Sequence, residues 1–347
     1  MLANFGSQGG PTDGTSGFCR KIDSTVGVGK RGLAFVTGPG DDGGNPNRAS
    51  FTIASGQFDT LKIRIAATGS LFLDLWYGGN DRFEVTIKTP TTTFGPYPSP
   101  PTNNDNTFIS NTSFVFYHLG SNVVFYGARN GKREIYLRID GAVGDYQLIM
   151  RGAAVANGRY DATLNPSFSF SPTFRGNIFL NRVAEGSIWD GATAFNNISP
   201  GCYNIRTSWV DIDGVTRSIL DQGSAGQLWT GSSIGPTFDG RLGVDLAAPG
   251  QSIVTTYGPT SYWATFRNNL IQNGNGQYGM AGAVSASAPV VTGVIALMLQ
   301  MNPQLDAIQI RNILRNSARA DGFTGTVPNT HWGYGKLNAL EVLRLTS

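Results

Sequence analysis

One stretch near the C-terminal end of the chain constrains the fold more than any other. Residues 278–300 begin with small side chains, pass through Ser285, and continue as a largely apolar run to residue 300. A helix that is hydrophobic on nearly every side belongs in the middle of a large core. We therefore predict a central buried helix over residues 286–300, with the rest of the chain folded around it.

Ser285 stands at the start of this predicted helix. The first N–H groups of a helix have no intrahelical acceptor, and they lie at the positive end of the helix dipole. Pro289 falls in the first turn, where a missing N–H costs little. A serine there suits a nucleophile whose attack creates an oxyanion. A buried helix that simply begins with small residues fits the same pattern, so both interpretations stay open on these residues alone.

Several ordered motifs around Ser285 point to one family. Residues 283–289, AVSASAP, resemble the Gly-Thr-Ser-Met-Ala-Ala-Pro nucleophile motif of the subtilisin-like serine peptidases, the subtilases. Upstream, residues 233–241 and 245–250 resemble the family's Ser-Ser-Arg-Gly-Pro and Asp-x-x-Ala-Pro-Gly segments. Downstream, residues 309–314 and 332–339 fit its closing helices. The chain is identified as a member of the subtilases by this resemblance, which implies a serine endopeptidase fold with Ser285 at the nucleophile position.

The first fifty residues resemble an earlier part of the same domain. One segment is similar to the Ser-x-Gly strand that lines the family's substrate cleft, and another is similar to the Ala-Ala-Gly-Asn loop that carries the oxyanion-hole asparagine. The resemblance places Asp41 at that asparagine position. It implies substrate binding by two groups of residues, namely Asn4, Phe5 and Gly6, and Gly38, Pro39 and Gly40. The match begins in the middle of a subtilase domain, after the family's catalytic Asp and His motifs.

The chemistry of acyl transfer needs a base, a group that orients it and oxyanion donors in addition to a nucleophile. The chain has two histidines, His118 and His331, and we interpret both as structural residues. An ionised Asp41 about 3 Å from an oxyanion would repel it by ~5 kcal/mol at an effective dielectric near 20, although the resemblance implies that a few active members carry Asp here. Val284 replaces the motif threonine, and Ala283 replaces a glycine where the backbone turns tightly.

Two hypotheses follow from these departures. In the first, the chain is a subtilase homologue that is proteolytically incompetent alone and binds peptides or proteins. In the second, it is the C-terminal half of an active peptidase whose Asp and His half lies on another chain or was truncated. Without that half, the predicted strand over residues 31–37 or its neighbour exposes an apolar edge. We therefore expect a partner half, self-association or a rebuilt edge, and no cofactor.

The pattern along the chain predicts an α/β fold in three segments. Residues 1–50 and 158–347 form the subtilase core, a parallel sheet with its central helix, and residues 51–157 form an inserted antiparallel β-sandwich, a jelly-roll. Alternating apolar and polar residues predict eight strands. The Pro-rich stretch 90–101 is expected to be a loop. The predicted strands cover residues 51–53, 60–66, 70–77, 82–88, 113–117, 122–126, 134–139 and 145–151.

Local signals predict the remaining core elements. An N-cap within residues 13–16 and the four-residue spacing of Phe18, Ile22 and Val26 predict an amphipathic helix. Short apolar runs predict buried parallel strands at residues 31–37, 197–203 and 244–247. Two helices are expected near the end of the chain, at residues 306–318 and 337–345.

Composition excludes some function classes. A net charge of +3 without a basic stripe argues against nucleic-acid binding, and the absence of an apolar run of about 18 residues argues against a membrane span. The N-terminus lacks the features of a signal peptide, whereas the family resemblance implies a secreted or cell-envelope protein. Cys19 and Cys202 are expected to be unpaired and half-buried, and a disulfide between them is the alternative. No calcium-loop pattern stands out, so no metal site is predicted.

Overall fold

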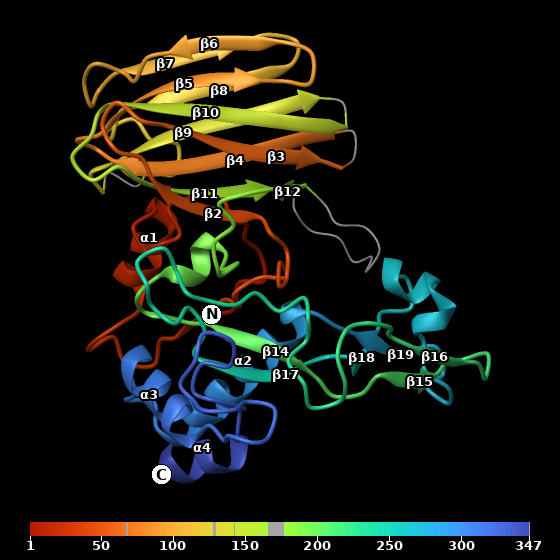
Figure 1. The fold of residues 1–347 in the computed structure, drawn as a ribbon. Coiled ribbons are helices and arrows are strands. Elements are labelled where there is room, and N and C mark those ends of the chain that lie inside the picture. The colour runs from red at the N-terminus through yellow and green to blue at the C-terminus, as the bar shows by residue number, and fades with distance from the viewer. Residues whose placement is uncertain (67–68, 128–129, 142, 166–176, 347) are drawn as a thin grey trace.

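The fold combines a β-sandwich with an α/β core. The computed structural model describes residues 1–66, 69–127, 130–141, 143–165 and 177–346. The sandwich stacks on the part of the core that holds the N-terminal helix α1, and a strand-rich arm projects from the opposite part of the core (Figure 1). The predicted class is confirmed, since parallel and antiparallel sheets occur together with helices in one mixed α/β chain.

A short parallel sheet forms the floor of the core. Strand β13 (Asn197–Ile198) pairs with β1 (Phe35–Val36). The chain continues past Ser199 as β14 (Pro200–Asn204), which pairs with β17 (Leu246–Gln251) on the other side. Leu2 bridges in parallel to Val36, so the N-terminal residues form the outer edge of this sheet. Apolar runs produced these strands as predicted, although β1 is shorter than expected. The strands are β1 (Phe35–Val36), β13 (Asn197–Ile198), β14 (Pro200–Asn204) and β17 (Leu246–Gln251).

Helix α2 (Val284–Met301) lies across this sheet and packs against β14 and β17. Ala288, Val291 and Met298 are fully buried on its inner side. The prediction that the helix is buried on every side is wrong. One face is exposed because the chain supplies neighbours on the other side only. We call this face the exposed stripe, and its residues are Ser285, Pro289, Gly293, Ala296, Leu297 and Gln300.

Helices α1 and α3 begin where they were predicted, whereas α4 begins at Ala339 and not at the predicted Leu337. Ser16 caps α1 (Gly17–Thr25) by accepting a hydrogen bond from the Cys19 N–H. Asp306 caps α3 (Ala307–Ser317), and the Gln309 side chain completes a reciprocal capping box. The last helix, α4 (Ala339–Thr346), packs against α2 and α3.

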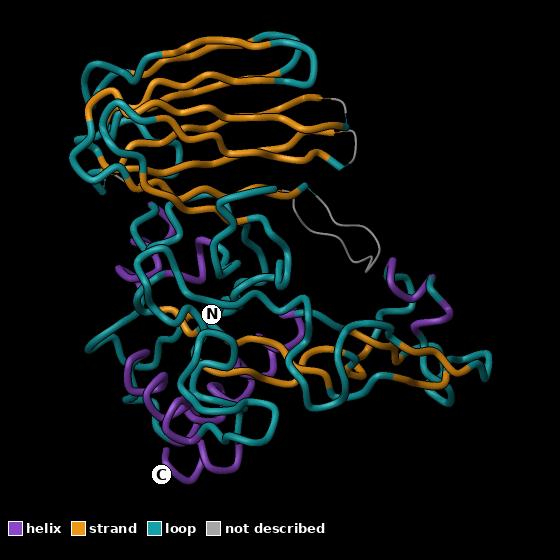
Figure 2. Tube along the Cα trace, viewed as in Figure 1, coloured by secondary structure: helices purple, strands orange, loops and turns teal. Residues whose placement is uncertain are grey.

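The projecting arm is a feature that the sequence pattern did not predict. It contains two antiparallel pairs and two short 3₁₀ helices, and the second pair leads directly into α2 (Figure 2). Its elements are β15 (Ser208–Val210), β16 (Thr216–Ser218), β18 (Ile253–Thr256), β19 (Tyr278–Ala281), η2 (Tyr262–Thr265) and η3 (Arg267–Asn269).

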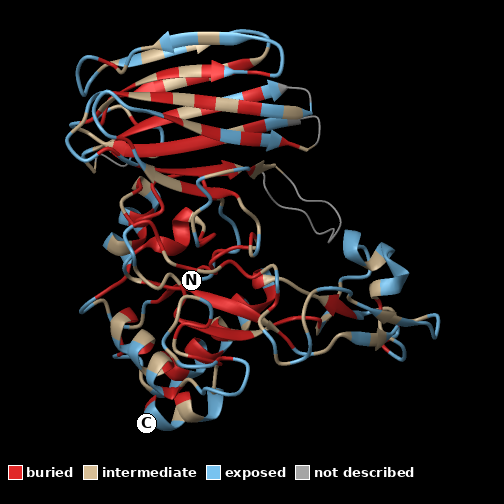
Figure 3. Ribbon diagram, in the orientation of Figure 1, coloured by how far each residue is buried: buried red, intermediate tan, exposed pale blue. Residues whose placement is uncertain are grey.

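The sandwich consists of two antiparallel sheets with strand orders β12-β3-β10-β5-β6 and β2-β11-β4-β9-β8-β7. Side chains alternate between a shared apolar core and the surface, which is the pattern that predicted the strands (Figure 3). The strands are β2 (Arg48–Thr52), β3 (Phe58–Ile65), β4 (Gly69–Gly78), β5 (Arg82–Lys88), β6 (Thr93–Tyr97), β7 (Asn106–Ser110), β8 (Phe114–Leu119), β9 (Lys132–Gly141), β10 (Gly144–Ala154), β11 (Arg159–Asn165) and β12 (Ile178–Phe179).

Two local predictions for the sandwich are wrong. The Pro-rich stretch 90–101 is not only a loop, because β6 lies within it and pairs with β5. Residues 122–126 are not a strand, because this segment leaves the sheet and the Tyr126 carbonyl accepts a hydrogen bond from the Gly17 N–H at 2.8 Å. Strands β11 and β12 share the sandwich sheets although they follow residue 157. The division into segments 1–50, 51–157 and 158–347 stays a prediction.

Buried polar contacts join the sandwich to the core. The Gly10 N–H donates to Asp74 Oδ2 at 2.6 Å, and Lys132 forms an ion pair with Asp13 at 2.7 Å. Burial raises the pKa of Glu134, the neighbour of Asp74 across β4 and β9, to about 10.

Both cysteines are free and fully buried, which corrects the expectation of half-buried thiols. Burial raises the pKa of Cys19 to about 12 and the pKa of Cys202 well above its usual value. Among the described helices, α2 alone is long and apolar enough to cross a membrane. Core helices of globular proteins pass the same test, so this property of α2 says little about membranes.

Candidate active site

The loop after β1 meets the start of α2. The Val284 N–H donates to Asp41 Oδ1 at 2.9 Å, so this carboxylate satisfies the first N–H of the helix. A Cβ atom built on Gly38 would lie 1.9 Å from Val284 Cγ1, which leaves room only for glycine. Two of the segments singled out from the sequence, residues 38–41 and 284–285, are thus in contact.

Residues 231–233 hold this loop in place. The Ser233 N–H donates to the Gly40 carbonyl at 2.9 Å, and Ser233 Oγ accepts the Asp42 N–H at 3.0 Å. The Gly43 N–H donates to the Gly231 carbonyl at 3.0 Å. The loop therefore presents Asp41 to the helix from a fixed backbone.

Ala283 stands at the N-cap of α2 with φ 71° and ψ 177°. This conformation belongs to a region that only glycine adopts without strain, and it costs other residues about 1–3 kcal/mol. The Gln251 side chain stabilises the turn, because its Oε1 accepts the Ala283 N–H at 2.8 Å. The family motif has glycine at this position because glycine adopts this conformation without strain. Gln251 is a positioning residue that the sequence analysis missed.

We expect Ala283→Gly to stabilise the chain by roughly 1 kcal/mol. The substitution removes the strain, and the greater flexibility of glycine in the unfolded chain offsets part of the gain. Urea denaturation followed by circular dichroism measures the change. Ala296→Gly is the matched control, since it places glycine within α2 and should destabilise by about 1 kcal/mol. Destabilisation by both substitutions would contradict the assignment of strain to Ala283.

The N-terminal segment reaches the same place from the other side. Asn4 Nδ2 donates to the Ser285 carbonyl at 2.8 Å. Asn4, Phe5 and Gly6 are all exposed. Three separate stretches of the chain therefore converge on the start of α2, as the family resemblance led us to expect.

Ser285 itself is exposed at the head of the stripe. Within the described residues, its hydroxyl makes no hydrogen bond, and its backbone N–H has no acceptor. This free N–H is a donor that could face an oxyanion. The hydroxyl, in contrast, has no hydrogen bond to a base among the residues that the structure describes.

Neither histidine supplies that base. His118 lies fully buried in β8, where its Nε2 is hydrogen-bonded to the Tyr77 hydroxyl, and burial lowers its pKa to about 3. His331 is exposed, and its ring contacts the neighbouring Thr330 hydroxyl. In the described part of the chain, no hydrogen bond joins either imidazole to Ser285. Both histidines therefore lie in structural surroundings.

The charge of Asp41 depends on pH in the physiological range. Burial raises the pKa of Asp41 to about 6, and the nearby Asp42 carboxylate raises it further, while the bond from the Val284 N–H opposes both effects. Above pH 6 the side chain is an acceptor with a negative charge. Below pH 6 it carries a proton and can donate. A subtilase asparagine would donate at every pH.

Trp189 is a second residue that the sequence analysis missed. Its backbone N–H donates to the Pro39 carbonyl at 2.8 Å, and its indole N–H donates to Asp42 Oδ2. It precedes the short helix η1 (Asp190–Thr193). Because about 150 residues separate Trp189 from its partners in the chain, no local pattern could have revealed the contact.

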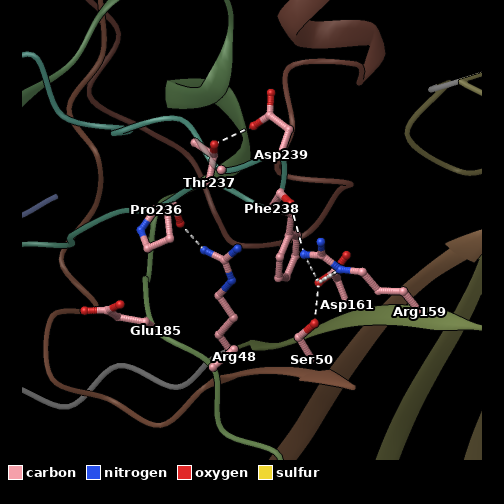
Figure 4. A pocket seen from close by; sticks show the side chains of 11 residues that line it. Arg48, Ser50, Arg159, Asp161, Glu185, Pro236, Thr237, Phe238 and Asp239 are labelled. Atoms are coloured by element: carbon pink, nitrogen blue, oxygen red, sulfur yellow. Dashed lines mark hydrogen bonds and ion pairs between the residues drawn. The ribbon is translucent and has the colours of Figure 1, made fainter. Parts of the chain in front are cut away.

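A separate pocket lies between the sandwich and the core. The Arg48 side chain crosses it and stacks on the Phe238 ring, with its guanidinium carbon 3.7 Å from the ring centre, while Arg159 pairs with Asp161 on the other side (Figure 4). Arg159 and Asp161 thus pair across its lining, while the Arg48 guanidinium donates to the Pro236 carbonyl. Across the part of the chain that the structure describes, no group of three or more His, Cys, Asp or Glu side chains could hold a metal ion.

Comparison with known proteins decides the family. The family model for the subtilases matches residues 7–335, which is most of the chain. The chain belongs to the subtilase family. Serine protease AprX of Bacillus subtilis is 28% identical over 151 residues, which cover 42% of this chain and 33% of AprX. Fervidolysin of Fervidobacterium pennivorans is 36% identical over 99 residues, 28% of this chain and 14% of fervidolysin.

A solved structure confirms the subtilase fold over nearly the whole chain. The CspB protease of Clostridium perfringens superposes with a TM-score of 0.71 at 19% identity, and the match covers 99% of this subtilase and 65% of CspB. The chain therefore spans a third or less of the two curated relatives and about two thirds of CspB. Homology to serine peptidases is established, whereas activity remains to be proposed.

Proposed function

We propose that this chain presents the nucleophile half of a subtilase site and does not hydrolyse peptide bonds by itself. The observation that carries the proposal is the exposed Ser285 hydroxyl, which has no base within hydrogen-bond reach in the described structure. A serine hydroxyl is a weak nucleophile unless an adjacent base removes its proton. The triad without its histidine and aspartate retains only a small part of its catalytic effect.

The oxyanion side of the site supports the same proposal. One donor, the Ser285 N–H, is free, but the second position holds a carboxylate that already accepts from Val284. Above pH 6 this carboxylate would repel the developing negative charge. A histidine base works best near or above pH 7, whereas Asp41 carries the proton of a donor only below pH 6. The base and this donor would therefore be active in different pH ranges.

The exposed stripe on α2 favours a second candidate function, in which this chain is one half of an active peptidase. The stripe begins at Ser285 and includes Leu297, whose exposed fraction is 47%. Leu33 and Phe5 add apolar surface near the outer sheet edge, with 48% and 64% exposed. Exposed apolar residues that continue from the nucleophile position are candidates for an interaction site. A polypeptide with the Asp and His motifs could cover the stripe and complete the site, with a peptide or protein as substrate.

Hydrolysis of fluorescently labelled casein tests the proposal. We expect the isolated chain and its Ser285→Ala variant to cleave casein equally slowly, at the background rate. Faster cleavage that is lost in Ser285→Ala would contradict the proposal.

The Ser285→Cys variant serves as the accessibility control. Cys19 and Cys202 are fully buried, so a maleimide should react rapidly only with the new thiol. Rapid alkylation together with absent hydrolysis would show that the nucleophile position is open and lacks a base. Slow alkylation would instead mean that Ser285 is covered, which would contradict the site described above.

A further inference from the structure

Trp189 fills the space between the two segments that face the candidate cleft. A Cβ atom built on Gly6 would lie 2.9 Å from Trp189 Cε3, and one built on Gly40 would lie 2.5 Å from Trp189 Cδ1 and Nε1. These separations are shorter than any ordinary carbon contact, so the indole packs directly on the backbone of both glycines. The ring therefore spans the gap between residues 4–6 and residues 38–40.

Hydrogen bonds to both walls fix the ring in this position. The Trp189 N–H donates to the Pro39 carbonyl, and the indole N–H donates to the buried Asp42 carboxylate. On the opposite wall, the Asp190 N–H donates to the Ser7 carbonyl at 2.9 Å. The indole cannot leave the gap without breaking its bond to Asp42. It is a built part of the cleft.

The wall formed by residues 4–6 is free to bind an extended peptide. These residues are exposed, and within the described structure their backbone groups make no hydrogen bonds to other residues. Backbone groups that are free in this way can pair with a peptide strand. Asn4 is hydrogen-bonded to Ser285, so a peptide on this edge would run past the nucleophile position. The side chain just before the bond that faces Ser285 would then point into the gap that Trp189 fills.

We propose that Trp189 restricts this pocket to small side chains, so that the cleft accepts glycine, alanine or serine before the scissile bond and excludes aromatic residues there. The inference rests on the proposed function, since it takes the cleft to be a peptide site. In this proposal, Trp189 determines which substrates the site accepts, although it lies outside the nucleophile and oxyanion motifs. The glycines on both walls admit the indole, and the indole then takes the volume that a large substrate side chain would need.

Peptide binding by isothermal titration calorimetry tests this assignment without requiring catalysis. The probes are the tetrapeptides Ala-Ala-Pro-Ala and Ala-Ala-Pro-Phe, titrated into the full chain. We expect the chain to bind the alanine peptide about 10-fold or more tightly than the phenylalanine peptide, and Trp189→Ala to reverse this preference. Trp189→Leu should give an intermediate preference and keeps the test valid if the alanine variant does not fold. Trp209→Ala, in the arm, should change nothing.

Three outcomes would overturn the proposal: tighter binding of the phenylalanine peptide by the unmodified chain, an unchanged preference in both Trp189 variants, or no binding of either peptide. The last outcome would leave the proposed lack of hydrolysis intact, since that claim concerns the missing base. Conversely, casein cleavage by the isolated chain would contradict the proposed function and leave the peptide preference standing. The two failures are therefore distinguishable.

Discussion

Co-expression with a subtilase N-terminal half that carries the Asp and His motifs is expected to raise Ser285-dependent casein hydrolysis by about 10⁴-fold or more. Residues of a triad act as a unit, and loss of the base removes most of the rate enhancement. The exposed stripe and the outer sheet edge at residues 1–3 are the surfaces that such a half would cover. Ser285→Ala in the same assembly should return the rate to background.

The stripe itself provides the control for assembly. Leu297→Asp places a charge on the stripe and should weaken association by about 100-fold, because the carboxylate would be buried without a partner. Leu220→Asp makes the same change on an exposed residue of the arm, 69% exposed, and should leave association unchanged. Analytical ultracentrifugation measures both. A bound half that leaves Ser285 unreactive would contradict the second candidate function.

Asp41→Asn is expected to raise the hydrolysis rate of that assembly at pH 8 by roughly 10²–10³-fold. An amide donates a hydrogen bond to the oxyanion at every pH, and loss of this donor in subtilisin costs roughly 2.7–4 kcal/mol. Asn Oδ1 can still accept the Val284 N–H, so the start of α2 keeps its cap.

The gain in hydrolysis rate from Asp41→Asn should increase with pH. The pKa of Asp41 is raised to about 6, so the residue is protonated at pH 5 and ionised at pH 8. The gain from Asp41→Asn should therefore be small at pH 5 and grow as pH rises through 6. Asp213→Asn is the matched control, because Asp213 lies in the arm and pairs with Arg267, and it should have little effect. A gain that does not vary between pH 5 and pH 8 would contradict repulsion by ionised Asp41.

The elements that the sequence predicted well are those with strong local signals. The apolar run from residue 286 predicted α2, and the alternation of side chains predicted most strands of the sandwich. The helix expected at residues 306–318 is α3, which ends at Ser317. The family motif has glycine where this chain has Ala283, which predicted a tight turn there. The positive φ of Ala283 agrees with that prediction.

The misses have a common cause, which is long-range contact. The apolar composition of α2 could not show that the chain covers only one of its faces. Residues 122–126 alternate like a strand, yet Tyr126 is bonded to Gly17, far away in the sequence. Trp189 was invisible as a site residue for the same reason, since Gly6 and Gly40 come near it only in the folded chain.

The most direct test of the account is the reaction of the isolated chain with a fluorophosphonate, followed by intact mass spectrometry. The reagent modifies a serine hydroxyl only when a base activates it. The account predicts that neither the chain alone nor Ser285→Ala gains the mass of an adduct. One adduct per chain, absent from Ser285→Ala, would show that Ser285 is activated without a second half and would contradict the central claim.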